Sequence, residues 1–137
     1  MQAEQLLGAL ANNLQRKGYS PIAGPPPIAF AMFKPAAGLG VPKLVGVVAN
    51  TDEPSVTFAR AEPWLKKTMG RSGAGLLLLL QLNPPQSYVA KTLQQGHGAL
   101  GYGQLVCGVY DLSANAYYLP KGAYDTYHMG WDQELFG

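Results

Sequence analysis

Five consecutive leucines, Leu76 to Leu80, constrain the fold of this 137-residue chain more than any other feature. Glycine-rich residues 72–75 precede the run and Asn83-Pro84-Pro85 follow it, so turn-forming residues bound a short apolar segment. Alternate side chains of a β-strand point to opposite faces, which sends the even-numbered leucines from Leu76 to Leu82 one way and the odd-numbered ones the other. A strand that is apolar on both faces must be covered on both. We therefore predict a central strand between two covering layers.

The composition predicts one domain with an unusually neutral surface. A chain of 137 residues can bury a core without disulfides or metals, and we treat 1–137 as a single domain. Charged residues are 13% of the chain, whereas about 25% is usual in soluble domains. The net charge is +2, and basic residues are spread from Arg16 to Lys121. Binding to nucleic acid is therefore not favoured.

The N-terminal residues and the apolar runs predict a cytoplasmic protein that does not bind membranes. The N-terminal residues contain neither a basic segment nor an apolar core of the kind found in secretory signals. The longest apolar run is much shorter than a bilayer-spanning helix requires. Cys107 is the only cysteine, which excludes an intramolecular disulfide and a cysteine-rich zinc site.

Apolar stripes at helical spacing predict three helices, at about 2–17, 62–69 and 84–95, each followed by a glycine. Alternating or continuous apolar runs predict strands at about 28–34, 44–49, 76–82 and 104–110, and residues 114–119 form a further candidate. The segment 55–60 has two interpretations. It alternates Val56 and Phe58 with smaller residues, which indicates a third, peripheral strand or the beginning of the second helix.

This order of elements predicts an α/β (α+β) domain. A mixed sheet of about 4–6 strands, with the leucine strand at its centre, would be flanked by about three helices. Strands joined by short links should be antiparallel, whereas links that contain a helix permit parallel neighbours around the leucine strand.

The element order is similar to that of the restriction-endonuclease-like fold, whose common core is a helix, a three-stranded meander, a helix and a fourth strand. That family holds a divalent cation with an Asp near the second strand and an acid-x-Lys motif on the third. This chain has Asp52 just after its second strand, but residues 57–62 contain no acid-x-Lys. The resemblance therefore implies the scaffold without the nuclease site, and such a scaffold favours a binding role.

Two glycine-rich segments have the residue types of phosphate loops in the wrong context. The pattern GxGxxG occurs from Gly96 to Gly101, but a helix precedes it and a strand follows, the reverse of a dinucleotide site. We interpret it as a linker. Lys66 and Lys67 come before the glycines at 70–75 rather than after them. We interpret these lysines as cations that complement the dipole of a helix C-terminus.

Cysteine, histidine and carboxylate residues form no recognisable catalytic or metal-binding motif. Cys107 with His97 or His128 and Asp111 contains the residue types of a nucleophilic site. A single cysteine in an apolar strand is, however, typical of a buried core residue, which we favour. The two histidines lie far apart and lack ligand spacing, so neither a metal nor a cofactor is predicted.

The C-terminal segment, about 120–137 with the residues just before it, is dense in aromatic side chains and otherwise irregular. Tyr and Trp supply large rigid contact areas with a polar group, which is typical of protein interfaces. An equally open alternative is a tail folded back over its own sheet. Phe136 belongs to the same segment. The residues predicted to bind a partner are Tyr117, Tyr118, Tyr124, Tyr127, His128 and Trp131.

From these observations we predict a non-enzymatic module that binds another protein or assembles as a homo-oligomer. Low charge suits the centre of an interface, and no catalytic constellation competes with this interpretation. The alternative is a small hydrolase or nuclease-like enzyme whose site is assembled from residues scattered along the sequence. Its candidate residues are Asp52, Glu62, Asp111 and His97.

Overall fold

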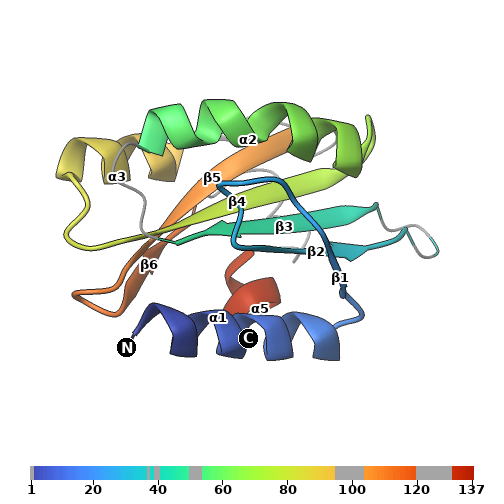
Figure 1. The fold of residues 1–137 in the computed structure, drawn as a ribbon, viewed down its shortest axis with the longest axis horizontal. Coiled ribbons are helices and arrows are strands. Elements are labelled where there is room, and N and C mark those ends of the chain that lie inside the picture. The colour runs from blue at the N-terminus through green and yellow to red at the C-terminus, as the bar shows by residue number, and fades with distance from the viewer. Residues whose placement is uncertain (1, 37, 39–40, 50–53, 95–103, 120–130) are drawn as a thin grey trace.

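A six-stranded mixed sheet lies between two layers of helices in the computed structural model of the protein (Figure 1). The structure describes residues 2–36, 38, 41–49, 54–94, 104–119 and 131–137. The strands are β1 Ser20–Ile22, β2 Phe30–Lys34, β3 Lys43–Val48, β4 Ala74–Gln81, β5 Gln104–Asp111 and β6 Ala116–Tyr118, and they lie side by side in chain order. The first three form an antiparallel meander, β4 and β5 run parallel to β3, and β6 returns antiparallel.

The predicted leucine strand is β4, and its central position is confirmed. All eight of its residues are buried, and it pairs in parallel with β3 on one side and β5 on the other. Leu76, Leu78 and Leu80 belong to one core cluster, whereas Leu77 and Leu79 belong to the cluster on the opposite face. Leu82 differs from the prediction, because it lies beyond the end of the strand and is 69% exposed.

The two clusters correspond to the two helical layers. Helices α1 Ala3–Arg16 and α5 Trp131–Phe136 cover one face, and α2 Pro54–Met69 and α3 Gln86–Gln94 cover the other (Figure 1). The buried stripe of α1 is Leu6, Leu10 and Leu14, a spacing that places all three on one side of the helix. Among the described residues, none of the helices combines the length and the apolarity needed to cross a bilayer.

Three elements differ from the sequence-based expectations. The first is α5, a fourth helix within the C-terminal segment that was predicted to be irregular. Residues 55–60 are part of α2, so the helical interpretation is correct and the strand interpretation is wrong. Phe58, Ala61, Leu65 and Met69 recur at three- to four-residue spacing against one cluster, and this longer helical period outweighs the short alternation around Val56. The first strand of the meander is β1, which has only three residues and no periodicity to reveal it.

Close backbone packing at two glycines fixes α2 against the sheet. A Cβ on Gly46 in β3 would lie 3.2 Å from Leu65 Cδ2, so the missing side chain lets α2 approach the strand. Gly73 allows the turn between α2 and β4, because a Cβ there would lie 2.1 Å from the carbonyl oxygen of Met69. The leucine strand therefore begins directly beneath the end of α2.

Candidate functional site

The described part of the predicted aromatic surface lies where β6 meets α5. Tyr117, the middle residue of β6, is opposite Tyr110 of β5 and is 43% exposed, whereas Tyr110 is buried. The Phe136 ring stacks on Tyr117, with centroids 4.3 Å apart and planes 19° apart. It also lies 6.0 Å from the Tyr110 ring, tilted by 38°. Phe136 therefore connects the exposed tyrosine to the core.

An ion pair from the middle of the sheet holds α5 in place. Lys43 of β3 places its Nζ 2.6 Å from Glu134 Oε1, and the two side chains are only 11% and 13% exposed. Removing two charges from water costs free energy, and only a close contact between them offsets that cost. Loss of either partner would leave the other charge buried and unpaired, which would destabilise the fold. Trp131 and Leu135 add apolar contacts, since both are buried in the cluster that contains α1.

Donors from the end of α1 bind the last carbonyl groups of α5. Lys17 Nζ donates to the carbonyl oxygens of Gln133 and Glu134, the latter at 3.0 Å. Asn13 Nδ2 donates to the carbonyl oxygen of Leu135 at 2.9 Å. The carbonyl oxygens of Glu134 and Leu135 belong to a helix end that leaves its last carbonyl groups without an intrahelical partner, whereas Gln133 O also accepts a hydrogen bond from the Gly137 N–H at 3.1 Å. Phe136 follows directly, so its ring is presented to Tyr117 from a fixed support.

The predicted partner-binding residues have three different environments. Tyr117 and Tyr118 lie on β6, the first largely exposed and the second half-buried. Trp131 is 5% exposed within the core, so the alternative of a tail packed on its own sheet describes this residue. Tyr124, Tyr127 and His128 lie outside the described residues. Phe136 was not among the predicted binding residues, because no local pattern indicates that it stacks on a tyrosine so much earlier in the chain.

Asp111 acts as the anchor of the loop that leads to β6. Its Oδ1 accepts hydrogen bonds from the backbone N–H of Ser113 at 2.9 Å, of Asn83 at 3.3 Å and of Ala114 at 3.4 Å, and from the Ser113 hydroxyl. The Ser113 hydroxyl is the main cause that lowers the pKa of the Asp111 carboxyl, and burial opposes it. A carboxylate held ionised by loop donors is poorly suited to act as a general acid.

Of the other candidate enzyme residues, Glu62 lies on α2, with its Oε1 3.8 Å from Lys66 Nζ across one helical turn. Asp52 and His97 lie outside the described residues, as does the GxGxxG segment.

Cys107 is a core residue, as its place in an apolar strand predicts. It is 3% exposed in the layer beneath α2 and α3, and its Sγ lies 3.3 Å from the Tyr88 hydroxyl. Burial raises the pKa of the Cys107 thiol to about 11, although the bond to Tyr88 opposes the rise. The thiol is therefore protonated at neutral pH, and a protonated thiol is a weak nucleophile.

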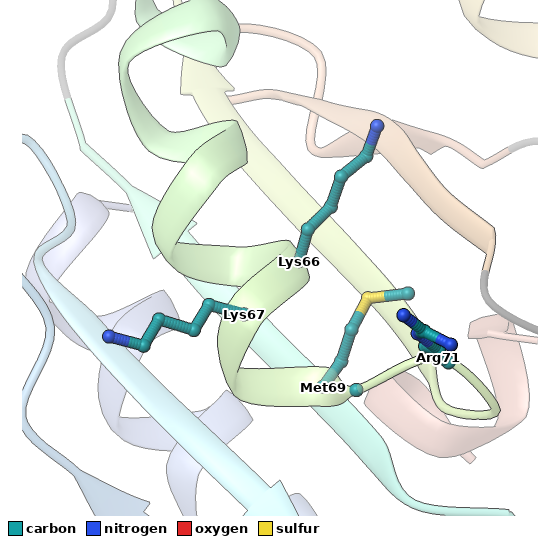
Figure 2. A pocket seen from close by; sticks show the side chains of 5 residues that line it. Lys66, Lys67, Met69 and Arg71 are labelled. Atoms are coloured by element: carbon teal, nitrogen blue, oxygen red, sulfur yellow. The ribbon is translucent and has the colours of Figure 1, made fainter.

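The C-terminal end of α2 carries a basic surface around an open hollow of about 410 Å³. Lys66, Lys67, Met69, Gly70 and Arg71 line it. Figure 2 shows Lys66 and Lys67 extending to opposite sides of the helix end, so their ammonium groups do not converge on a common point. Lys66 and Lys67 occupy the last turn of α2, where cations complement the helix dipole, as the sequence indicates.

Comparison with family models, with curated proteins and with solved structures finds no match to this chain. Within the described ranges, no group of three or more His, Cys, Asp or Glu side chains is arranged to hold a metal ion. The surface formed by Tyr117 and Phe136, called the β6–α5 surface below, is therefore the candidate site for which the structure gives the most physical detail. Tyr118 is the strand neighbour of Tyr117 and points to the opposite face of the sheet, so it is not part of this surface.

Proposed function

We propose that this protein is a non-enzymatic module that binds a protein chain through its β6–α5 surface. The observation that carries the proposal is Tyr117, an exposed tyrosine stacked on a phenylalanine that is itself fixed to the core. Tyrosine is enriched among residues that dominate binding energy, because it buries a large area and loses little side-chain entropy.

Rigid support strengthens this proposal. Ordering a flexible side chain on binding reduces affinity, whereas a side chain already held in place avoids most of that loss. Lys43, Lys17 and Asn13 hold α5, and α5 holds Phe136 against Tyr117. Among the described strands, β6, which carries Tyr117, lies at the end of the sheet. Tyr124, Tyr127 and His128 lie outside the described residues and remain predicted partner-binding residues.

We propose further that the scaffold is of the restriction-endonuclease-like kind. Support comes from the order α1, the meander β1–β3, α2 and a parallel β4, which is the element order of that common core. The alternative of a nuclease-like or hydrolytic enzyme receives less support, because the Asp111 carboxylate is occupied by its own loop. A binding role on this scaffold is the simpler proposal.

Photo-crosslinking tests the proposed binding surface. A benzoylphenylalanine introduced at Tyr117 should form covalent adducts with a second protein chain when the producing cells are irradiated. The matched control carries the same group at Ser20, an exposed residue of β1 at the opposite edge of the sheet. We expect discrete adducts from position 117 and none from position 20. The absence of adducts from position 117, in a variant that melts like the wild type, would contradict the proposal.

A further inference from the structure

Positive charge is concentrated in the segment that forms helices α2 and α3. Residues 54–94 carry five basic side chains and one acidic side chain, whereas the rest of the chain carries five basic and seven acidic ones. Only 13% of the residues are charged, so this separation of charge is unusual for so neutral a chain. Three of the five basic residues, Lys66, Lys67 and Arg71, line the open hollow at the C-terminal end of α2.

The helix dipole accounts for only part of this charge. The C-terminal end of a helix is equivalent to roughly −0.5 elementary charge, whereas each of the three basic side chains at the hollow carries a full positive charge. Glu62 offsets one of them in part, because its Oε1 lies 3.8 Å from Lys66 Nζ and both side chains are exposed to water. An excess of positive charge therefore remains at the end of α2.

The end of α1 provides a comparison within the same molecule. It also ends in two cations, but Lys17 donates to carbonyl oxygens of α5 and Arg16 donates to Asn13 Oδ1. Lys67 and Arg71 are exposed, and among the residues that the structure describes neither forms an ion pair or a hydrogen bond. The cations of α1 therefore support the fold, whereas those of α2 are accessible to a ligand.

The arrangement of the cations at the hollow indicates the class of ligand. Gly70, at φ 79°, ends α2 in a left-handed conformation, and Arg71 follows it beside the last helical turn (Figure 2). Figure 2 shows Lys66 and Arg71 on one side of the helix end and Lys67 on the other. Cations that diverge in this way do not enclose a single phosphate, but each can meet a separate carboxylate along an extended chain. Met69, the apolar side chain of the lining, is buried, so it is not available for insertion into a membrane.

We infer that the C-terminal end of α2 binds an acidic segment of a protein chain, whose carboxylates pair with Lys66, Lys67 and Arg71. Opposite charges on the two partners speed their encounter, and an arginine can pair with a carboxylate through two parallel hydrogen bonds. A nucleic acid fits less well, because the rest of the chain carries more acidic than basic side chains and would repel a phosphate backbone. Helices α2 and α5 cover opposite faces of the sheet, so this inference does not depend on the β6–α5 surface (Figure 1).

Fluorescence anisotropy of the full chain with a fluorescein-labelled octaglutamate peptide tests this inference. We expect saturable binding at an ionic strength of about 0.1 M, at which charges more than about 10 Å apart are largely screened. An exposed ion pair changes a dissociation constant by a factor of up to about five. Arg71→Gln should therefore raise the Kd of the peptide by about threefold, and Lys67→Gln combined with Arg71→Gln should raise it by about tenfold. The same peptide with glutamine in place of each glutamate should not bind.

Arg16→Gln is the matched control, because it removes the same charged group from the end of α1 in the opposite layer. It should change the Kd of the peptide by less than about 1.5-fold, since screening weakens the effect of a distant charge. Equal losses for Arg71→Gln and Arg16→Gln would overturn the inference, because the peptide would then respond to net charge alone. A wild type that does not bind the peptide, or that binds a single-stranded oligonucleotide more tightly, would overturn it as well.

Titration of the peptide into the wild type, followed by the NMR signals of backbone amides, keeps the test independent of how the variants fold. The signals of residues 66–71 should shift and those of β6 should not, whereas shifts in β6 without shifts in 66–71 overturn the inference. The two proposals fail differently. A peptide that does not bind, together with crosslinking from position 117, refutes this inference and retains the proposed function, and the reverse result refutes the proposed function alone.

Discussion

The central strand is tested most directly by comparing Leu78→Ala with Leu82→Ala. The two leucines are four positions apart, but Leu78 is completely buried and Leu82 is 69% exposed. Truncating leucine to alanine removes three carbon atoms, which corresponds to about 2.4 kcal/mol of lost transfer free energy at about 0.8 kcal/mol for each. The cavity adds to this loss, because β3 and β5 hold β4 from both sides and prevent the site from collapsing. We expect Leu78→Ala to lower the free energy of unfolding by about 3–5 kcal/mol.

Urea denaturation followed by circular dichroism and by tryptophan fluorescence measures both variants. Leu82→Ala, as the matched control, should change the free energy of unfolding by less than about 0.5 kcal/mol, as expected for an exposed side chain. Equal losses of free energy of unfolding for the two variants would refute the placement of β4. They would mean that Leu78 and Leu82 are equally buried, which contradicts the structure. A Leu78→Ala loss of less than about 1 kcal/mol, outside the range of buried Leu→Ala changes, would refute it as well.

Three further predictions follow from individual contacts. Cys107 should react slowly with a thiol reagent in the native protein and rapidly in urea. Burial raises its pKa from an ordinary 9.0 to about 11, so its contribution to the free energy of unfolding should be intact below pH 9 and should fall as the pH rises toward 11. Urea melts at a series of pH values would detect this loss. Asp111→Ala should lower the free energy of unfolding by about 1–3 kcal/mol at pH 7, because it removes hydrogen bonds to a charged group. The fold lowers the pKa of Asp111, so the difference in the free energy of unfolding between wild type and Asp111→Ala should shrink as the pH falls through and below about 4, the pKa of an unfolded Asp. A difference that does not change with pH would exclude a role for the ionised carboxylate. Gly73→Ala should lower the melting temperature, because a Cβ at Gly73 would overlap the Met69 carbonyl oxygen. Gly8→Ala, the control, should not lower it, because no atom lies within 4 Å of a Cβ at Gly8.

The sequence by itself determined the central strand and the layered class of fold. The information is local: a run of leucines between turn residues has an apolar side chain on both faces whatever lies around it, and burial of both faces requires two covering layers. The stripe of Leu6, Leu10 and Leu14 likewise indicates the face that α1 buries. The basic last turn of α2 and the burial of Cys107 were likewise predictable from the few residues that surround each of them in the sequence.

Only the tertiary structure decided which aromatic residues are core and which are surface. Trp131 and Tyr117 belong to the same aromatic-rich end of the chain, but one is buried and the other exposed. The difference arises because Lys43, 91 positions earlier in the chain than Glu134, pairs with it and brings α5 onto the sheet. The three-residue strand β1 is too short to show an alternating hydrophobic pattern, so the sequence does not predict it. It is a strand because it pairs with β2. Contacts between residues so distant in sequence depend on how the elements pack, and a local pattern contains no record of them.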